Sequence, residues 1–459
     1  MEIIIKKSLH YLNLWRKWTK GSINRQIFAA AVTVGLLTGL VKFASVGKEL
    51  VVAWQFGTGN ELDAFIIAMV VPSFVVNVLA GSFKSALIPT YIKTREQKGQ
   101  KAAQQLFSEV VIWALGLLTV TAIVLAIAAP IYLPLLASGF APEKLRLTLR
   151  LLWLVSPLIL LFGIINIWGG VLNAGERFAL AAFSPAITPL ATVILLVGFS
   201  NWGIYALAGG LIVGAVLEII VLGIGLRRQR VSLLPKWSGR NANVNLVASQ
   251  YFPAATGAFL MCSTGLVDQS MAAMLDSGSV AALSYANRVI ALPLSLATLA
   301  LGTAVIPYFS KTIAQKNWSK INHTFNYYLR LIFITTIPLT IILVLTSRLI
   351  IKVLFERGSF NAEDTQIVSQ IQTYYALQIP FYISSVFVVP LINSLGVNHF
   401  LVWGSSINLS VNIGANYAFV QWIGISGIAL STSCVYLISF VFLYVLTKKY
   451  LRKISLENI

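Results

Sequence analysis

The stretch SALIPTYIK at residues 85–93 returns as TAVIPYFSK at residues 303–311. Two further pairs are separated by nearly the same distance, about 220 residues. They are VLNAGERF at 171–178 with LINSLGVNHF at 391–400, and NWGIYALAGG from Asn201 with QWIGISGIAL from Gln421. Three ordered pairs at one separation, close to half of the 459 residues, indicate an internal duplication rather than a chance likeness between apolar segments. The sequence therefore predicts two halves with the same order of helices.

The composition is that of an integral membrane protein. Hydrophobic residues make up 57% of the chain and charged residues 11%, and the mean hydropathy is +0.81, which excludes an ordinary soluble domain. The net charge is +19, but the sequence has no nucleic-acid-binding motif and the basic residues gather between apolar runs. The topology of a membrane protein therefore explains these residues better than nucleic-acid binding. Cys262 and Cys434 lie inside apolar runs without the spacing of a zinc site, and we interpret them as packing residues.

About twelve apolar runs are long enough to cross a bilayer as helices, each of which needs roughly 20 residues. They lie near residues 28–55, 63–91, 107–136, 148–173, 178–199, 203–226, 246–274, 279–307, 324–346, 366–395, 398–420 and 423–447. Counted from a cytoplasmic N-terminus, the basic segments KTREQKGQK, RRQRVSLLPKWSGR, SKTIAQKNWSK and TKKYLRK all fall on the cytoplasmic side. Both termini are therefore predicted to face the cytoplasm.

This pattern predicts an all-α polytopic membrane protein of about twelve helices in two six-helix lobes. Because six is even, the lobes are expected to be related by a pseudo-two-fold axis along the membrane normal, as in transporters with parallel repeats. The predicted parts are a cytoplasmic amphipathic N-terminus (1–27), an N-lobe (28–226), a cytoplasmic linker (227–245), a C-lobe (246–447) and a cytoplasmic tail (448–459). Such a duplication favours a transporter with a central site between the lobes.

Several charged residues fall inside or at the ends of the predicted helices, where a charge near the bilayer centre costs about 2.5–3.5 kcal/mol. They are Lys42, Lys48 and Glu49 in GLVKFASVGKELVVAWQFG (residues 39–57), followed by Asp63, Asp268 and Arg288. We expect these charges to converge on one water-filled cavity, whose surplus of cations suits an anionic, phosphate-bearing substrate. The sequence leaves open a structural alternative, in which Lys48 pairs with Asp63 or the long side chains reach the headgroups.

A ladder of amides marks the eleventh predicted helix. In SSINLSVNIGANYAF, residues 405–419, Asn408, Asn412 and Asn416 recur every four positions and therefore lie on one helix face. Asp268 on the seventh helix and the hydroxyls of Ser431 to Ser433 on the twelfth are the predicted partners of that face. One carboxylate with several neutral oxygens is a plausible cage for a monovalent cation. Hydrogen bonding between helices is the alternative reading of the same residues.

With these motifs in view, the chain resembles the MviN/MurJ family of lipid II flippases, within the multidrug/oligosaccharidyl-lipid/polysaccharide transporter superfamily. The resemblance covers all twelve predicted helices. It is carried by FGTGNELDAF (56–65), GGVLNAGERFALAAFSP (169–185), GSVAALSYANRVIALP (278–293), ALGTAVIPYFSK (300–311) and LFERGSFNAEDT (354–365). It implies that a monomer in the bacterial inner (plasma) membrane binds an undecaprenyl-pyrophosphate saccharide in a cationic cavity. The protein would carry the headgroup across the membrane by alternating access.

The resemblance also implies roles for single residues. The family's paired helix 1 arginines look like Lys42 and Lys48, and its Arg-Asp dipeptide looks like Lys48-Glu49. Its helix 2 acid corresponds to Asp63 and its helix 8 arginine to Arg288. The sodium site that the resemblance implies uses the residues Asp268, Asn408, Asn412 and Thr432. Sodium would be a coupling ion, and no other cofactor is expected.

Two departures from the family leave the cargo open. Val76 and Asn77 occupy the positions of a helix 2 arginine pair, and Asn77 is kept in the predicted substrate site. The family usually has two more helices for the polyprenyl tail, whereas this sequence ends at Ile459. A flippase for another polyprenyl-linked saccharide, such as an exopolysaccharide or O-antigen precursor, is therefore the main alternative. A drug/cation antiporter would need an acidic cavity. An enzyme would need a large loop with acidic residues or histidines, and the sequence has only three histidines, His10, His323 and His399.

Overall fold

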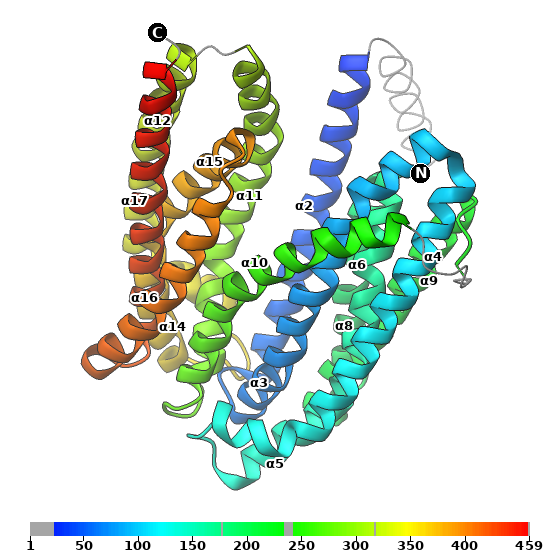
Figure 1. Cartoon of the computed structure of the whole chain (residues 1–459). Helices are drawn as coiled ribbons and strands as arrows, with labels where there is room; N and C mark the ends of the chain where they lie inside the picture. Colours follow the sequence, from blue (N-terminus) through cyan, green and yellow to red (C-terminus); the bar gives the residue numbers. More distant parts are fainter. Residues whose placement is uncertain (1–22, 176–177, 234–241, 316–317, 458–459) are drawn as a thin grey trace, which may run out of the picture. The chain divides into compact units, whose positions relative to one another are not determined.

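The computed structural model describes residues 23–175, 178–233, 242–315 and 318–457, and every regular element in these ranges is a helix. Figure 1 labels most of these helices and colours them along the sequence. The prediction of an all-α fold is therefore confirmed for the described residues. The amphipathic segment expected at 1–27 lies almost wholly outside them, as does the centre of the linker expected at 227–245.

The helices of the first half of the sequence are α2 (Ile23–Phe56), α3 (Asn60–Val75), the π-helix η1 (Val76–Ala80), α4 (Gly81–Leu136), α5 (Pro142–Val155), α6 (Leu158–Ala174), α7 (Phe178–Phe183), the 3-10 turn η2 (Ser184–Ala186), α8 (Ile187–Gly198), the 3-10 turn η3 (Ser200–Trp202) and α9 (Ile204–Arg228). Those of the second half are α10 (Ala242–Ala272), α11 (Ser279–Ala314), α12 (Trp318–Leu345), α13 (Ser347–Phe355), α14 (Ala362–Ala376), α15 (Ile379–Leu395), α16 (His399–Ile423) and α17 (Ser426–Glu457).

Six stretches of the described residues are long and apolar enough to cross a bilayer, and two bent helix pairs raise the number to eight. The longest stretch, Asn60–Leu136, covers two predicted spans, because Gly99 has a positive φ of 82° and breaks the helix between them. The bent pairs, α5 with α6 and α14 with α15, each turn by 43°. The helices α2, α10 and α16 cover the remaining predicted ranges, so each of the twelve predicted spans has a helical counterpart.

Breaks in the helices follow local chemistry. Proline removes a backbone donor and crowds the preceding turn, and Pro72 lies inside α3 directly before the π-helix η1. The bend between α14 and α15 likewise falls at Leu377 and Gln378, just before Pro380. Asn361 begins α14 with a capping box, in which its side chain accepts from the backbone of Glu363 and Asp364 while Asp364 accepts from the backbone of Asn361.

The chain forms two compact units, and each unit is made of segments that are separated in the sequence. Unit 1 contains the described parts of Met1–Glu49, Phe83–Leu117 and Leu160–Ala248, and unit 2 contains Leu50–Ser82, Leu118–Ile159 and the described parts of Ser249–Ile459. Unit 2 therefore includes segments from the first half of the sequence, which pack against α11 and α14. The lobe boundaries expected from the sequence, 28–226 and 246–447, remain a prediction.

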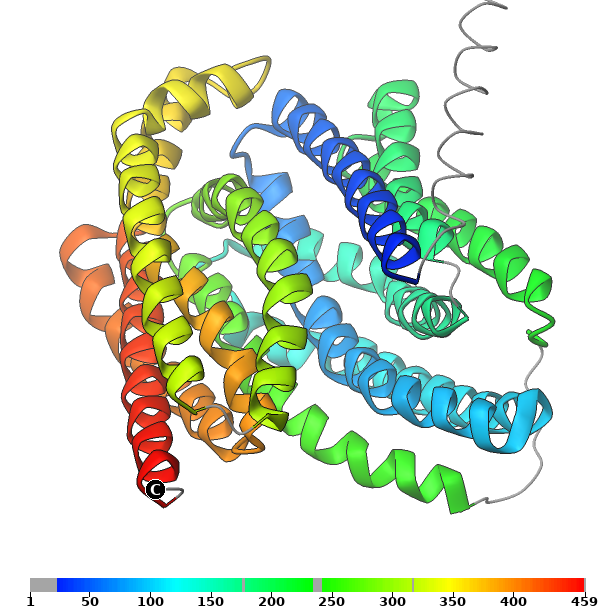
Figure 2. The ribbon, with the colours of Figure 1, turned by 90° about the horizontal axis from the view of Figure 1, so that it is seen from above.

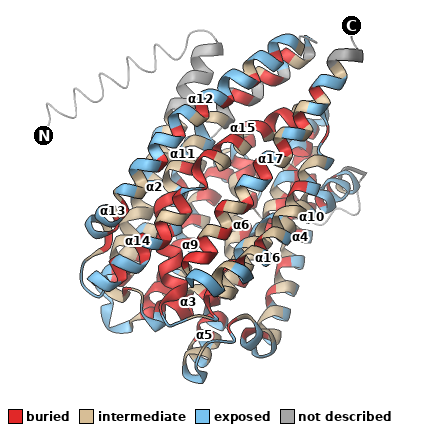
Figure 3. Cartoon of the chain, turned by 90° about the vertical axis from the view of Figure 1, so that its left-hand side faces the viewer, coloured by how far each residue is buried: buried red, intermediate tan, exposed pale blue. Residues whose placement is uncertain are grey.

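Within unit 1, α8 and α9 lie side by side, and within unit 2 the last two helices, α16 and α17, form the same kind of pair (Figure 1). Figure 2 shows α17 beside α12 and α15. Buried residues line the helix faces that meet neighbours, and exposed residues lie on the outer faces (Figure 3). Many exposed side chains are large and apolar, for example Ile127, Ile131 and Leu135 on α4, each more than 70% exposed, as expected of a surface that faces lipid.

Candidate functional site

A buried carboxylate in unit 2 lies at the centre of the amide ladder. Asp268 on α10 is 8% exposed, and its Oδ1 accepts hydrogen bonds from Nδ2 of Asn412 at 2.9 Å and of Asn416 at 2.7 Å. Its Oδ2 accepts from the hydroxyl of Thr432 on α17 at 3.3 Å. We call Asp268, Asn412, Asn416 and Thr432 the Asp268 cluster. The predicted meeting of these three helices at one acid is therefore present in the structure.

The amide oxygens of this cluster are the atoms that a cation would use. Asn412 and Asn416 are 1% and 0% exposed, and the Oδ1 atom of each is buried with no hydrogen-bond partner among the described residues. A half-turn of either amide about its last side-chain bond exchanges nitrogen and oxygen, and places a neutral oxygen beside the carboxylate. The described residues contain no group of three or more His, Cys, Asp or Glu side chains placed to hold a metal. A single negative charge with neutral oxygens suits a monovalent cation better than a divalent one.

A cavity of about 530 Å³ adjoins the Asp268 cluster. Asp268, Asn412 and Thr432 line it together with Asn408, whose Nδ2 donates to Ser439 at 3.1 Å. Asn408 is therefore one helical turn away from the cluster and has a partner of its own. Asn416, and not Asn408 as predicted, binds Asp268. The spacing of four along α16 contained the signal for Asn416, since all three amides share one face.

A second polar group joins the two halves of the sequence within unit 2. Asp63 on α3 is 1% exposed, and Nζ of Lys144 on α5 lies 2.7 Å from its Oδ2. The backbone N–H groups of Gly278 and Ala281 donate to the same carboxylate at 2.7 and 2.8 Å. Asp63 thus caps the N-terminus of α11, where unpaired N–H groups and the helix dipole favour a negative charge.

Further hydrogen bonds surround this cap. Ser277 donates to Asn60, and Thr58 donates to Asp364 of α14. We call these residues, together with Asp63 and its partners, the Asp63 clamp; its members are Thr58, Asn60, Asp63, Lys144, Ser277, Gly278, Ala281 and Asp364. Lys144 had no signal in the sequence, because nothing in its local pattern points to an acid 81 residues before it.

One glycine of the clamp, Gly278, and one beside it, Gly57, let backbone segments meet closely. Gly278 has φ of +90°, and a Cβ there would lie 2.6 Å from the carbonyl oxygen of Thr58. Gly57 has φ of +52°, and its Cβ would lie 2.4 Å from the carbonyl oxygen of Ser359. Both positions combine a left-handed backbone with contact to another segment's main chain, so they admit only glycine without rearrangement.

The predicted cationic residues have different surroundings. Lys42 on α2 is exposed, whereas Lys48 lies 2.7 Å from its neighbour Glu49, and these two side chains are 18% and 13% exposed. Asp63, which the structural alternative pairs with Lys48, binds Lys144. Arg288 is half-buried on α11, one turn beyond the buried Ser284.

The expected convergence of all charges on one place does not hold for the two acids. Asp63 belongs to the clamp at the N-terminus of α11, and Asp268 belongs to the amide cluster on α10, α16 and α17, and they share no partner. In η1, Asn77 is exposed and Val76 is 5% exposed. Asn77 is therefore the accessible one of the two positions that carry arginine in the family that the chain resembles.

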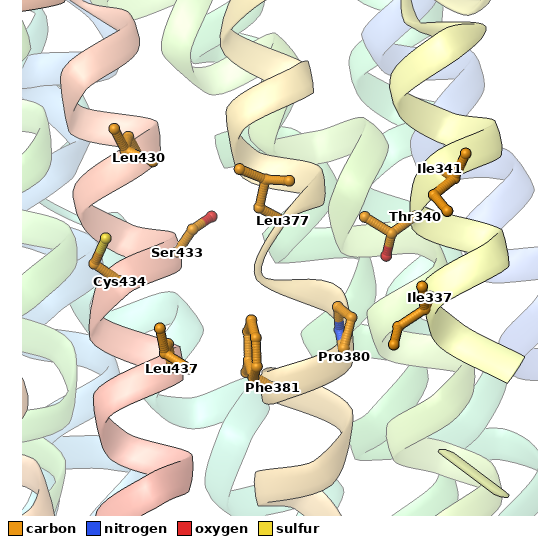
Figure 4. Close-up of a pocket in the computed structure, with 10 residues that line it drawn as sticks. All are labelled: Ile337, Thr340, Ile341, Leu377, Pro380, Phe381, Leu430, Ser433, Cys434 and Leu437. Carbon is orange, nitrogen blue, oxygen red and sulfur yellow. The ribbon is translucent and has the colours of Figure 1, made fainter. Parts of the chain in front are cut away.

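A second cavity of unit 2 is almost wholly apolar. It has a volume of about 410 Å³ and lies at the bend between α14 and α15, between α12 and α17 (Figure 4). Its polar side chains include Ser433, which donates to the carbonyl of Tyr374 at 2.7 Å, and the same carbonyl accepts from the backbone N–H of Leu377. The cavity offers no charge to a pyrophosphate, and we assign it no part in headgroup binding.

The sequence of this chain is similar to those of proteins from one known family. The family model described as Lipid II flippase MurJ matches residues 52–459. A probable lipid II flippase MurJ of Synechocystis sp. is 28% identical over 455 residues, covering 94% of this chain and 83% of its own. The lipid II flippase MurJ of Burkholderia cenocepacia is 26% identical, covering 88% and 80%.

Solved structures agree with this match. A lipid II flippase MurJ in an inward closed conformation superposes with a TM-score of 0.80 at 25% identity, covering 93% of this chain and 90% of its own. An inward-facing multidrug resistance MATE family transporter has a TM-score of 0.75 at 13% identity, a likeness of fold alone. The structure is thus that of a multi-pass membrane transporter rather than an enzyme, and the chain belongs to the MurJ family of lipid II flippases.

Proposed function

We propose that this chain translocates lipid II, or a closely related polyprenyl-pyrophosphate saccharide, across the bacterial inner membrane. The family match over residues 52–459 is the observation that carries the proposal. Arg288, Lys42 and Lys48 supply positive charge on membrane helices, where a guanidinium or ammonium group binds pyrophosphate by charge-assisted hydrogen bonds. The direct test is flipping of labelled lipid II in vesicles containing the purified protein, with growth of a flippase-depleted strain as the cellular test. Flipping of an O-antigen precursor but not of lipid II would identify the alternative cargo.

The Asp63 clamp suits a protein that works by alternating access. It joins α3 and α5 of the first half of the sequence to α11 and α14 of the second half through hydrogen bonds at one end of these helices. Release of the headgroup on that side requires these bonds to break and to re-form in each cycle. We propose that the clamp is the closed gate on the non-cytoplasmic side, with both chain termini in the cytoplasm and the protein acting as a monomer.

We further propose that the Asp268 cluster binds sodium as a coupling ion. The two partnerless amide oxygens and the single carboxylate support this assignment. When bound, the ion would neutralise a carboxylate that otherwise remains charged in a membrane-spanning region. Asp268, Asn412, Asn416 and Thr432 would hold it, and Asn408 with Ser439 would form the next polar group along the cavity.

The Asp268→Asn variant should lose the response to sodium. Removal of the charge leaves only neutral oxygens, so we expect the thermal stabilisation that sodium gives to the wild-type protein to disappear, along with sodium dependence of flipping. Glu61→Gln, which neutralises an exposed acid of the same unit, is the matched control and should retain both responses. An unchanged sodium response in Asp268→Asn would assign the cluster to helix packing.

Lys42→Gln combined with Lys48→Gln should stop headgroup flipping in vesicles. The double change removes both helix 1 cations and leaves Glu49 without its 2.7 Å partner, so the local field becomes repulsive to a pyrophosphate. Lys93→Gln, at an exposed basic residue of the same unit, should leave flipping close to the wild-type rate. In a second measurement, cysteines at positions 42 and 48 should react with a water-soluble thiol reagent, faster at 42. Complete protection of both positions in every transport state would show that these lysines do not face the substrate.

A further inference from the structure

A buried carboxyl group in unit 1 has no role in the function proposed above. Glu218 lies in α9, a helix long and apolar enough to span the membrane, and its side chain is 3% exposed. It is well inside the helix, ten residues before the terminal Arg228 and therefore about 15 Å from it along the axis. A carboxyl group at that depth is costly unless its surroundings satisfy it, and such residues commonly mark ion or proton pathways.

Two hydroxyl groups satisfy Glu218. Thr188 on α8 donates to its Oε2 at 2.9 Å, and Ser184 in η2 donates to its Oε1 at 3.3 Å. A hydroxyl is both donor and acceptor, so it can donate to a carboxylate and can accept from a carboxylic acid after rotating its own hydrogen toward a backbone carbonyl. Thr192, one turn along α8, already donates to the carbonyl of Thr188 in this way. The site therefore provides hydrogen bonds for both charge states of Glu218.

Among the described residues, the elements named next bring no charged group to this carboxyl. The elements α7, η2, α8 and η3 pack against α9, and α6 approaches it at Gly223 and Gly225. The described residues of these five elements contain no titratable side chain. On α9 itself the nearest charges are the exposed Arg227 and Arg228. A charged Glu218 would thus have only neutral donors, which makes uptake of a proton the direct way to neutralise it.

The internal duplication gives this pair a counterpart in the other half. Gly203 and Gly424, which precede α9 and the corresponding turn of α17, share an unusual backbone conformation, with φ of 53° and ψ of −133° in the first and φ of 59° and ψ of −140° in the second. Glu218 lies 221 residues before Ser439, the separation of Gly203 from Gly424, and Thr188 lies 220 residues before Asn408, the separation of Asn201 from Gln421. Ser439 and Asn408 are themselves hydrogen-bonded and line the cavity beside the Asp268 cluster. The equivalent position in the first half therefore holds an acid in place of a hydroxyl.

We propose that Glu218 is a proton-binding site, in which the carboxylate takes one proton from water to form a neutral acid and later returns it. The ligand is a proton rather than a metal ion, because two hydroxyls and one carboxylate supply few ligands and the side chain is almost completely buried. Exchange with water then requires a conformation other than the one described, so protonation is linked to conformational state. The proposal depends neither on the identity of the lipid cargo nor on sodium at Asp268.

Infrared difference spectroscopy of the purified protein in lipid tests the site without any transport. The wild-type protein should show the C=O band of a protonated carboxylic acid at acidic pH, and this band should fade as the pH rises. The component of this band that belongs to Glu218 should be absent from Glu218→Gln, which keeps the shape and one hydrogen-bonding oxygen of the side chain. Glu61→Gln, at an exposed acid, serves as the control and should retain the Glu218 component.

Two results would overturn the proposal. Identical difference spectra of the wild type and Glu218→Gln would mean that Glu218 does not change its protonation state, and a Glu218 band that stays constant from acid to alkaline pH would mean a permanently protonated packing residue. If Glu218→Gln does not fold, Thr188→Val serves in its place, because it removes one donor to the carboxylate and should make the band persist to higher pH. An unshifted band in Thr188→Val would likewise count against the site.

Discussion

Arg288→Ala should abolish lipid II flipping and should fail to support growth of a flippase-depleted strain, with no loss of protein from the membrane. Arg288 is the charged residue of α11 that precedes the long apolar run VIALPLSLATLALG, and an arginine at such a position requires an anionic partner or a functional reason. Its planar fork of donors matches the oxygens of a phosphate, and alanine offers none of them. We expect flipping to fall to the level of empty vesicles.

Two variants make this result specific. Arg288→Lys should flip slowly, because a point charge replaces a bidentate group. Asn287→Ala, at the exposed neighbour on the same helix, should flip at close to the wild-type rate. Normal growth of a strain that has only Arg288→Ala would remove Arg288 from the substrate site.

The second large effect is expected from Asp63→Ala, which should unfold the clamp rather than weaken substrate binding directly. It leaves the ammonium of Lys144, 9% exposed, without its counter-ion and leaves two N–H groups of α11 without an acceptor. Removal of one partner from a buried pair costs about 3–5 kcal/mol, which is a large fraction of the stability of a typical domain. The measurement is the thermal unfolding temperature in detergent, followed by flipping in vesicles.

Asp63→Ala combined with Lys144→Met separates the ion pair from the helix cap. Because the buried cation is then also removed, we expect the double variant to recover part of the unfolding temperature that the single variant loses. Lys352→Met is the matched control, since Lys352 is 63% exposed and lies 3.9 Å from Glu356, and it should shift the unfolding temperature little. A single variant as stable as the wild type would show that the clamp does not hold these segments together.

The parts of the structure that could be predicted from the sequence are those in which residues of one kind recur at a regular spacing. The amide ladder repeats every four residues, and the Asp268 cluster has the partners which that spacing predicts. The duplication likewise predicts the matching helix pairs α8 with α9 and α16 with α17. The all-α membrane fold depends on the same kind of regularity, apolar runs of the length of a bilayer.

The contacts that could not be predicted join residues with no shared pattern. Asp63 and Lys144 lie 81 residues apart on different helices, and the backbone donors Gly278 and Ala281 leave no side-chain signal at all. Glu218 is a lone acid in an apolar helix, and only the structure brings Thr188 and Ser184 to it. For the same reason the sequence predicted that all the charged residues meet in a single group. The structure instead has separate groups around Asp63 and Asp268, and each of these acids is bound by partners of its own.

The two glycines of the clamp region have a consequence for the speed of the transporter. A bond made by a side chain can be broken by rotation of that side chain, which takes picoseconds to nanoseconds, but Gly57 and Gly278 meet the carbonyl groups of Ser359 and Thr58 through the main chain. No rotamer change separates these atoms, so α3 and its preceding turn must leave α11 and the turn before α14 as whole segments. Such displacements take microseconds to milliseconds. If the clamp is the gate proposed above, brief thermal fluctuations would not open it and would not let ions leak across the membrane, and it would open only on the slower timescale of a transport cycle.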